Sequence, residues 1–569
     1  MIQRLLFSCF ILLSFGLLAQ QAPEDPQVGE AAAFDKSFWQ AQVFKNTQRY
    51  EQALKAFQRC DSLQPGHAVI LGELSVLCHQ LRRPAEAIDY AEQSLEAEDV
   101  QDWHFQQAAQ LYIELQMVDR AIEIVQALSK RQPESSDPLY LLTGLYIEKE
   151  AFDDALDCLN QLQKLRGIEP EVVLQKKQIY LELGELNKAL DELQVLVDAF
   201  PGDFNYRLEM AEVLAVNGRY DDARDLWLEI VAAYSIQPVA NLRLARYYQD
   251  HQQFEKAYGY LKVAMGNEEL DIDDKVAVLM NLYSKSQGDS ALTVKAYELV
   301  DLTVQSAPSD PRSWSVKGDF LLRDGHKAEA KTAFLKATTL PEGDRFEIWQ
   351  QILLIDAELS DWQALTEDAQ KTIDLFPSQA FPYLLAGIAH SQLEAYDQAA
   401  EWLQAGLDLA YGNRQLQAEL HATLAQVYHQ QAKHQASDQA FEQALRIDPN
   451  NAGTLNNYAY YLAVRGEKLS KALEMTEKSN RLSANNPTFI DTWAWVLFKM
   501  NRHQEALTLQ EKALALVESP SSELLEHLGD ILFHLNRKEE AIQRWIEARD
   551  LSPSPSDELL FKIENQRYE

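Results

Sequence analysis

A small residue returns every 34 positions along this chain of 569 residues, and no other feature limits the fold as strongly. The uninterrupted run is Ala53, Ala87, Ala121, Ala155, Ala189, Ala223, Ala257 and Ala291. The phase then jumps by 39 to Ala330, by 34 to Ala364, by 35 to Ala399 and by 38 to Ser437, before Ala472, Ala506 and Ala541 resume. A fixed period of this size predicts an array of similar units stacked in file, about fifteen of them over residues 34–555.

The segment 311–341 shows what one unit contains. Apolar or small residues recur at helical spacing on both sides of the dipeptide at 324–325, which predicts a helix, a turn and a second helix. Gly318 and Ala330 lack bulk, so the two backbones can approach closely, and the aromatic rings beside them fill the flanking volume. A larger residue at Ala330 would overpack the contact at a cost of about 1–3 kcal/mol. The signature residues of this unit are Trp314, Gly318, Ala330, Phe334 and Ala337.

On these residues the chain resembles the tetratricopeptide-repeat (TPR) family, whose unit is a helix-turn-helix of 34 residues. The resemblance implies an all-α, right-handed superhelical solenoid of about fifteen units in which the first helices line a concave surface. Other units repeat the pattern, with Tyr180, Gly184, Ala189 and Pro201 in the fifth and Ala425, Tyr428, Phe441, Ala444 and Pro449 in the twelfth. A polar tail from Asp557 is expected to form the terminal capping helix that a solenoid needs.

The repeat and its irregularities define the expected organisation. It comprises a signal peptide (1–19), a linker (20–33), units 1–7 (34–271), an irregular unit 8 (272–310), units 9–11 (311–413), units 12–15 (414–555) and a capping helix with tail (556–569). Unit 8 carries five extra residues, and residues 410–417 carry about four more. Such insertions either hold a binding feature or lengthen a turn and bend the array.

The first residues have the pattern of a secretory signal peptide. Arg4 is followed by an apolar run of about fifteen residues ending at Ala19, after which the chain becomes polar. The run is short for a membrane span, so we expect cleavage after Ala19; an uncleaved anchor, or lipidation at Cys9, are the alternatives. Export would place Cys60 and Cys78 where they can form a bridge, unless each simply fills a small buried position.

Charge and motifs limit the chemistry. The formal net charge of -35 argues against the basic face that nucleic-acid binding requires. No Gly-rich phosphate loop, HExxH or GxSxG motif occurs. His527, Asp530 and His534 share one helical stripe, but about 10 Å of helix separates the two histidines, too far for both to reach one metal ion easily. We therefore expect no enzyme activity, no metal and no cofactor.

The non-core faces of the last first helices predict a partner-binding groove. Asn side chains bond a peptide backbone as donor and acceptor, and Tyr or Trp offers a flat apolar area with a polar tip. The candidates are Asn456, Asn457, Tyr460, Asp491, Thr492, Trp495, Lys499, His527 and Asp530. The alternative is that Tyr460 and Trp495 merely pack between adjacent helices. The family's carboxylate clamp is absent, because Asp491, Glu526 and Asp530 hold matching positions; these acidic residues favour basic or neutral partner segments, as do Glu209 and Glu212.

The function predicted from these features is a non-catalytic scaffold that binds one or more proteins. The signal peptide and the architecture resemble exported TPR proteins of Gram-negative bacteria, which implies the periplasm and, by analogy, a peripheral association with the outer membrane. Two alternatives remain. One is a polysaccharide export component, in which Trp103, Trp349 and Trp495 stack on sugars; the other is an enzyme that uses the histidines of the last unit.

Overall fold

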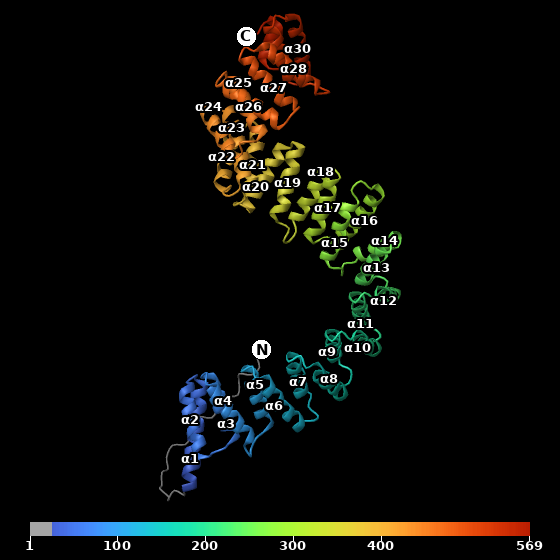
Figure 1. Ribbon diagram of the computed structural model, residues 1–569, viewed down its shortest axis with the longest axis vertical. Coiled ribbons are helices and arrows are strands. Elements are labelled where there is room, and N and C mark those ends of the chain that lie inside the picture. The colour runs from blue at the N-terminus through green and yellow to red at the C-terminus, as the bar shows by residue number, and fades with distance from the viewer. Residues whose placement is uncertain (1–25, 569) are drawn as a thin grey trace. The chain divides into compact units, whose positions relative to one another are not determined.

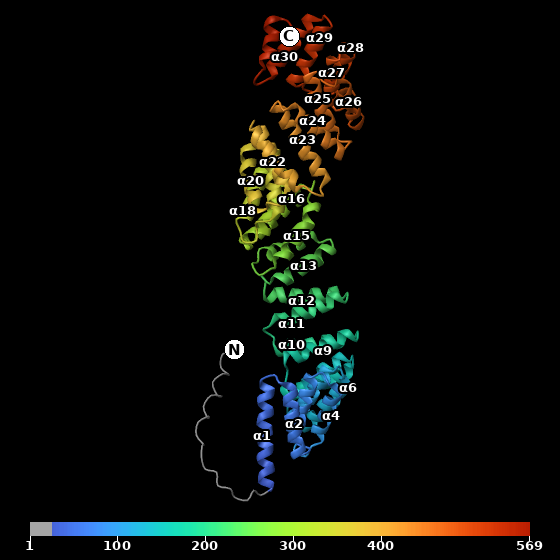
Figure 2. The same cartoon turned by 90° about the vertical axis from the view of Figure 1, so that its left-hand side faces the viewer.

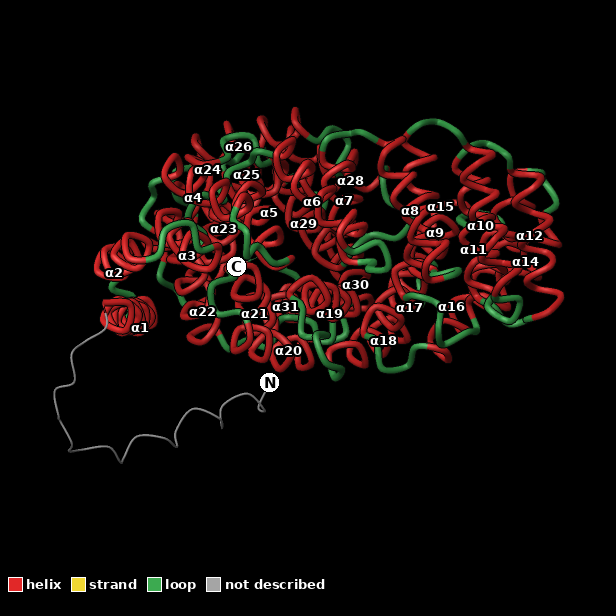
Figure 3. The backbone as a smooth tube through the Cα atoms, turned by 90° about the horizontal axis from the view of Figure 1, so that it is seen from below, coloured by secondary structure: helices red, strands yellow, loops and turns green. Residues whose placement is uncertain are grey.

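The computed structural model describes residues 26–568, with side chains from residue 30, and every regular element in that range is an α-helix. Figure 3 shows these helices joined by short loops. The chain divides into two compact units, residues 1–247 and 248–569, and the boundary falls within α13 (Pro238–Asp250). The helices of the first unit before α13 are α1 (Pro26–Asn46), α2 (Tyr50–Leu63), α3 (Ala68–Gln80), α4 (Pro84–Glu96), α5 (Asp102–Glu114), α6 (Val118–Arg131), α7 (Asp137–Glu148), α8 (Phe152–Arg166), α9 (Pro170–Glu182), α10 (Leu186–Ala199), α11 (Phe204–Val216) and α12 (Tyr220–Ala233).

The second unit continues in the same manner to the end of the described chain. Its helices are α14 (Phe254–Met265), α15 (Ile272–Lys285), α16 (Ser290–Ser306), α17 (Pro311–Arg323), α18 (Lys327–Thr338), α19 (Phe346–Leu359), α20 (Trp362–Leu375), α21 (Ala380–Gln392), α22 (Tyr396–Leu409), α23 (Arg414–Gln430), α24 (His434–Ile447), α25 (Ala452–Arg465), α26 (Leu469–Leu482), α27 (Pro487–Lys499), α28 (His503–Ala515), α29 (Ser522–His534), α30 (Lys538–Leu551) and α31 (Asp557–Asn565).

Consecutive helices form fifteen pairs, α1 with α2 through α29 with α30, and α31 follows the last pair. Within each compact unit, helices that are neighbours in sequence are also neighbours in space (Figure 1). In Figure 2, α9 to α12 are seen as successive layers of one stack. The predicted all-α array of helix-turn-helix units is therefore confirmed.

The 34-residue spacing follows from one position, the fourth residue of the second helix in each pair. Ala53 is the fourth residue of α2, Ala87 of α4 and Ala330 of α18, and all three are fully buried. A side chain at this position faces the partner helix, so only a small residue permits close packing in most units. Later pairs keep the rule with Ala399, Ser437, Ala472, Ala506 and Ala541.

Two of the residues assigned to this series are wrong. Ala291 is exposed and Ala296 is buried instead, so the phase jump of 39 lies between Ala257 and Ala296. In the tenth unit Leu365, rather than Ala364, is the fourth residue of α20 and is fully buried. Spacing alone could not separate these choices because an alanine happens to stand at the uninterrupted 34-residue interval in both units.

The two insertions lengthen helices. α15 begins 15 residues after Ala257, just as α3 begins 15 residues after Ala53, so the extra residues of unit 8 lie between Ile272 and Ala296. There α16 reaches 17 residues and starts three residues earlier relative to its buried alanine. The later insertion extends the start of α23, which also has 17 residues against 13 in α21.

Glycine in the first helix marks where an aromatic or leucine side chain of the second helix lies against the backbone. A Cβ added to Gly318 would come within 2.6 Å of the Phe334 ring, far closer than atoms can approach. Gly529 faces Trp545 in the same way, at 2.4 Å, and Gly387 faces Leu403 at 2.4 Å. Phe334 is thus the direct partner of Gly318, whereas Trp314 stays half-exposed and donates its Nε1–H to the Pro308 carbonyl at 3.0 Å.

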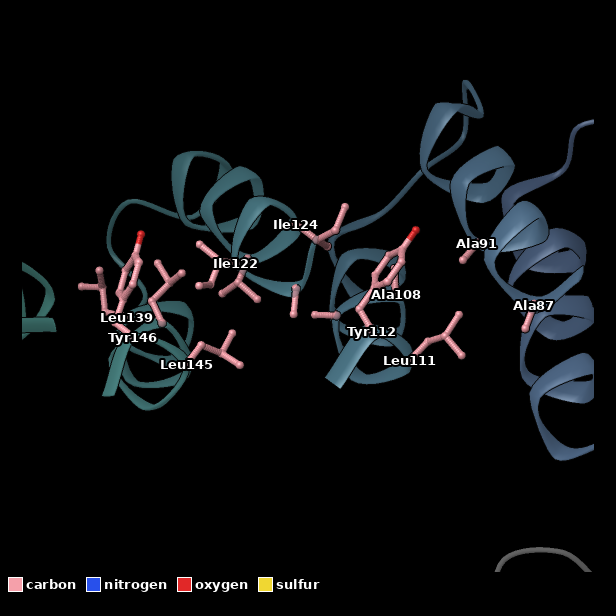
Figure 4. Packing of buried hydrophobic residues seen from close by; sticks show 14 of the residues in the cluster. Ala87, Ala91, Ala108, Leu111, Tyr112, Ile122, Ile124, Leu139, Leu145 and Tyr146 are labelled. Atoms are coloured by element: carbon pink, nitrogen blue, oxygen red, sulfur yellow. The ribbon is translucent and has the colours of Figure 1, made fainter. Parts of the chain in front are cut away.

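The core runs from unit to unit as a continuous row of buried side chains. Figure 4 shows this row in α4 to α7, where Leu111 of α5 points towards Ala91 of α4. Ala337 plays the same part in α18, where it joins a cluster with Ile348 and Trp349 of the following helix, as expected. Each unit is therefore completed by the next one.

The N-terminal assignment needs one correction. Helix α1 begins at Pro26, so the segment 26–33 is helical rather than linker. The expected signal peptide, residues 1–19, lies outside the described residues. None of the helices within 26–568 is long and apolar enough to cross a membrane. Cys60, Cys78 and Cys158 are free and buried, which agrees with the packing interpretation and not with a bridge.

Candidate functional site: the C-terminal first helices

The nine predicted partner-binding residues lie on three first helices that pack side by side in the second unit. Helix α25 carries Asn456, Asn457 and Tyr460; α27 carries Asp491, Thr492, Trp495 and Lys499; α29 carries His527 and Asp530. We call these nine residues the C-terminal surface. Their helices contact in the order α25, α27 and α29, so the sequence correctly placed the residues on neighbouring helices.

The expected openness of the C-terminal surface is wrong for most of its members. Asn456, Asp491, Thr492, Trp495, His527 and Asp530 are all less than a tenth exposed. Asn457, Tyr460 and Lys499 are half-buried. The cause is close stacking of the first helices, which encloses side chains at the seams, so the packing alternative for Trp495 is correct.

A charged pair is enclosed at the seam between α27 and α29. The His527 ring nitrogen Nδ1 lies 3.0 Å from Asp491 Oδ1 and 3.1 Å from Oδ2, and Gln510 of α28 donates its amide to Asp491 Oδ1 at 2.6 Å. Burial disfavours the charged imidazole, but the Asp491 carboxylate outweighs burial and raises the pKa of His527 above its ordinary value. The pair therefore holds His527 as a cation with Nδ1 donating to the carboxylate.

A second charged cluster joins α29 to the capping helix. Lys562 of α31 is enclosed and donates to Asp530 Oδ2 at 2.9 Å and to Glu526 Oε1 at 2.8 Å. The Trp545 indole of α30 donates to Asp530 Oδ1 at 2.9 Å. Burial raises the pKa of Asp530 to about 6, although Lys562 acts in the opposite direction. The capping helix is thus attached through a buried ion pair.

These pairings change the charge that a partner would meet. Asp491 and Asp530 are neutralised by His527 and Lys562. In the first unit, Glu209 lies 2.7 Å from the Lys177 Nζ and Glu212 lies 2.8 Å from the Arg243 Nε. The acidic residues that favoured a basic partner in the sequence are therefore already compensated within the chain.

Trp495 is the centre of the C-terminal surface. Its ring stacks on His527 with centroids 4.0 Å apart, and the Lys499 ammonium lies 4.6 Å from the Trp495 ring centroid. Its Nε1–H is buried and has no hydrogen-bond acceptor in the described chain. Asn456 Oδ1 on α25 is likewise buried without a donor. An unsatisfied buried group costs about 1–3 kcal/mol, so this surface lacks a donor and an acceptor.

Tyr460 connects helices that are not in the same or adjacent units. Its hydroxyl donates to Glu523 Oε1 of α29 at 2.7 Å, passing over α27. Burial raises the pKa of Tyr460 beyond its ordinary value. The hydrogen bond links the thirteenth unit to the fifteenth, a contact that a repeat pattern confined to neighbours does not predict.

The histidines of the last unit do not converge. His527 bonds Asp491, whereas His534 is exposed and stacks against His503 with centroids 5.0 Å apart. Across residues 26–568, no group of three or more His, Cys, Asp or Glu side chains is arranged to hold a metal ion.

The aromatic side chains proposed for sugar stacking are mostly enclosed. Trp349 is fully buried and Trp495 is 7% exposed, so neither presents a free face, while Trp103 is 44% exposed. A sugar ring needs an open aromatic face, so this arrangement gives the polysaccharide alternative no site beyond Trp103.

Several important residues were missed in the sequence. Gln510 lies on a second helix, and Lys562 lies in the tail, where a lysine looks like a solvated surface residue. The i, i+4 pair of Glu558 and Lys562 was visible, but nothing in it indicated a buried lysine. His503 and Tyr568 carry no signal of their own, because their contacts depend on how the last units stack.

The helix pairs, the fixed buried position and the shared row of core residues define the class of protein, a helical-repeat scaffold. Family models then specify the repeat. Models described as tetratricopeptide repeat match residues 418–451, 178–240 and 492–555, so the chain is a TPR protein in these ranges. The model of ChAPs (Chs5p-Arf1p-binding proteins) matches residues 39–172.

Individual relatives are distant. A TPR repeat-containing protein of Pseudomonas aeruginosa is 27% identical over 155 residues, which cover 26% of this chain and only 24% of that protein. The structure titled APC/C hetero-tetramer Cut9-Hcn1 is 17% identical, covers 89% of this chain and 98% of that chain, and has a TM-score of 0.35. Yeast Tom70 is 16% identical, covers 88% and 94% respectively, and has a TM-score of 0.30. At these TM-scores the two structures carry no argument about function.

Proposed function

We propose that this protein is a non-catalytic scaffold that binds extended segments of partner proteins at the C-terminal surface. The observation that carries the proposal is the pair of buried, unsatisfied atoms, Trp495 Nε1 and Asn456 Oδ1. Each residue of an extended peptide brings one N–H and one C=O, which are the groups that these two atoms lack. The half-buried Asn457 and Tyr460 would border such a segment.

The surrounding network supports binding without large rearrangement. Asp491 and His527 fix each other, Gln510 fixes Asp491, and the stacked His527 ring fixes the Trp495 plane. A site whose side chains are already ordered loses little entropy when the partner binds. Because the buried charges are compensated, the partner segment is expected to be neutral or mixed in charge.

We also propose that the protein is exported and acts in the cell envelope, with a peripheral association with the outer membrane. The support is the sequence of residues 1–19, with its single basic residue, apolar run and polar continuation. The test is mass spectrometry of the N-terminal peptide after cell fractionation. A mature chain starting at Gln20 in the periplasmic fraction supports export, and a cytoplasmic chain that retains Met1 excludes it.

The scaffold proposal is tested by affinity capture from the cell that produces the chain. The bait is the chain without residues 1–19, and the variant combines Asn457→Ala with Trp495→Phe. Phenylalanine keeps a ring to stack on His527 and removes only the N–H, whereas alanine at this buried position would cost about 3–5 kcal/mol and confuse binding with folding.

Trp493→Phe is the matched control. Trp493 lies on the same helix and also has a buried, unsatisfied Nε1, but it lines a different hollow of about 240 Å³ with Ile490 and Lys512. A protein retained by the parent and the control but lost from the double variant supports the proposed surface. Equal retention by all three chains excludes the C-terminal surface, and no retained protein with any chain excludes the scaffold function in that cell.

A further inference from the structure

The tail after the capping helix places an aromatic side chain on the ends of two first helices. The Tyr568 ring lies 4.6 Å from the His534 ring and 5.8 Å from the Phe498 ring, measured between centroids. Its hydroxyl is 3.5 Å from the Lys499 Nζ. Tyr568 therefore contacts α27 and α29 at the edge of the C-terminal surface.

The tail is attached weakly. Helix α31 ends at Asn565, and Gln566 takes a left-handed conformation with φ of 50°. Residues 566–568, the last that the structure describes, make no backbone–backbone hydrogen bond beyond the helix. Arg567 lies over Phe561 of its own helix, so the Tyr568 side chain supplies the contacts that hold the tail against α27 and α29.

Tyr568 also leaves this place incompletely filled. The His503 Nδ1 atom is buried without a hydrogen-bond partner, although the His503 ring lies only 5.3 Å from Phe498. The Lys499 bond to the tyrosine hydroxyl is at the long limit, and Lys499 forms no ion pair within residues 26–568. A ring with further polar groups, as in a longer peptide, would satisfy the place better than Tyr568 does.

We propose that Phe498, Lys499, His503 and His534 form a subsite for an aromatic side chain of a partner segment, and that Tyr568 fills this subsite in the free chain. The inference rests on the proposed scaffold function and adds two things to it. The partner segment carries a tyrosine or a similar ring, and its binding displaces the tail. The tail thereby lowers the apparent affinity for partners in proportion to the fraction of time it occupies the subsite.

The direct test uses a small phenol rather than an unknown partner. N-acetyl-tyrosinamide is titrated against the full described chain and against its Tyr568→Ala variant, with binding followed by saturation-transfer NMR, and N-acetyl-alaninamide serves as the control ligand. We expect the variant to bind the phenol at least about tenfold more tightly than the parent, because the competing ring has been removed. Equal binding by the two chains, or none by the variant, overturns the inference.

Two further variants keep the test decisive. A chain ending at Asn565 removes the whole tail and must reproduce the result of Tyr568→Ala if collapse around the new alanine is not responsible. In the Tyr568→Ala background, His534→Ala should abolish phenol binding, whereas His326→Ala, which changes a histidine in the turn of another unit, should leave it unchanged. Loss with both histidine variants, or with neither, contradicts the assignment.

The inference and the proposed function fail in different ways. Phenol binding that depends on Tyr568 and His534 supports the subsite even if no protein is captured from the cell. A captured partner whose retention is the same for the parent and Tyr568→Ala chains overturns the competition, while the scaffold function stands.

Discussion

Replacing Lys562 by methionine should detach the capping helix in a pH-dependent manner. The lysine side chain is 2% exposed and its ammonium lies 2.9 Å from Asp530, which is 1% exposed. Methionine has a similar length, so the change removes the charge while preserving most of the packing. What remains is a buried carboxylate with only the Trp545 N–H as a partner.

The magnitude follows from removing one member of a buried pair, which costs about 3–5 kcal/mol when the other stays charged. Burial already raises the pKa of Asp530 to about 6, against about 3.9 in an unfolded chain. A raised carboxyl pKa means that this group favours the folded state below about pH 4 and loses that contribution as pH rises through about 6. Without Lys562 the pKa of Asp530 rises further, so the destabilisation should be small at pH 5 and reach its full size near pH 8.

The measurement is hydrogen exchange of peptides from α29 to α31 at pH 5 and pH 8, each corrected for the intrinsic pH dependence of exchange. Peptides from α3 to α6 serve as the internal reference, because contacts in a solenoid run between neighbours. The double variant Lys562→Met, Asp530→Asn should recover most of the lost stability, since asparagine can still accept the Trp545 N–H. An equal loss at both pH values, or a loss below about 1 kcal/mol at pH 8, would refute the buried-pair argument.

Three shorter predictions test the packing and the second charged pair. Gly318→Ala should cost about 1–3 kcal/mol because its new methyl group collides with the facing ring, whereas Gly144→Ala, whose Cβ meets nothing within 4 Å, should gain about 0.5–1 kcal/mol; urea unfolding of both variants decides. Ala296→Leu should lower thermal stability and Ala291→Leu should leave it within about 0.5 kcal/mol, and the reverse order in calorimetry would restore the original phase. The pKa of His527 is raised, so its contribution to stability should be complete below about pH 6.5 and fall as pH rises through the folded value; His527→Gln should flatten that part of the stability profile.

The helices could be predicted from sequence because each unit repeats one local solution. Ala53 and Ala87 occupy the same position in their helices, so the period alone located fourteen of the second helices to within a few residues. Where a unit deviates, the period is ambiguous. Ala291 lies 34 residues after Ala257, but the extra residues in unit 8 give the buried place to Ala296.

The candidate site was predicted only in part. Helical spacing correctly brought Asp491, Trp495 and His527 to neighbouring helices. Their burial and pairing depend on the distance between stacked helices, which no residue of a single unit encodes. Lys562 and Tyr568 reach the site from the tail, and the sequence of the units contains no information about that return.

The hydrogen bond from Tyr460 to Glu523 has a consequence for cooperativity. A linear array with only nearest-neighbour coupling can fray from its end one unit at a time. This bond adds a next-nearest-neighbour interaction, so the last unit cannot open without weakening a unit two places away. The last three units should consequently melt as one block, and an event at the terminal helix pair should be felt by α25, about a hundred residues earlier in the chain.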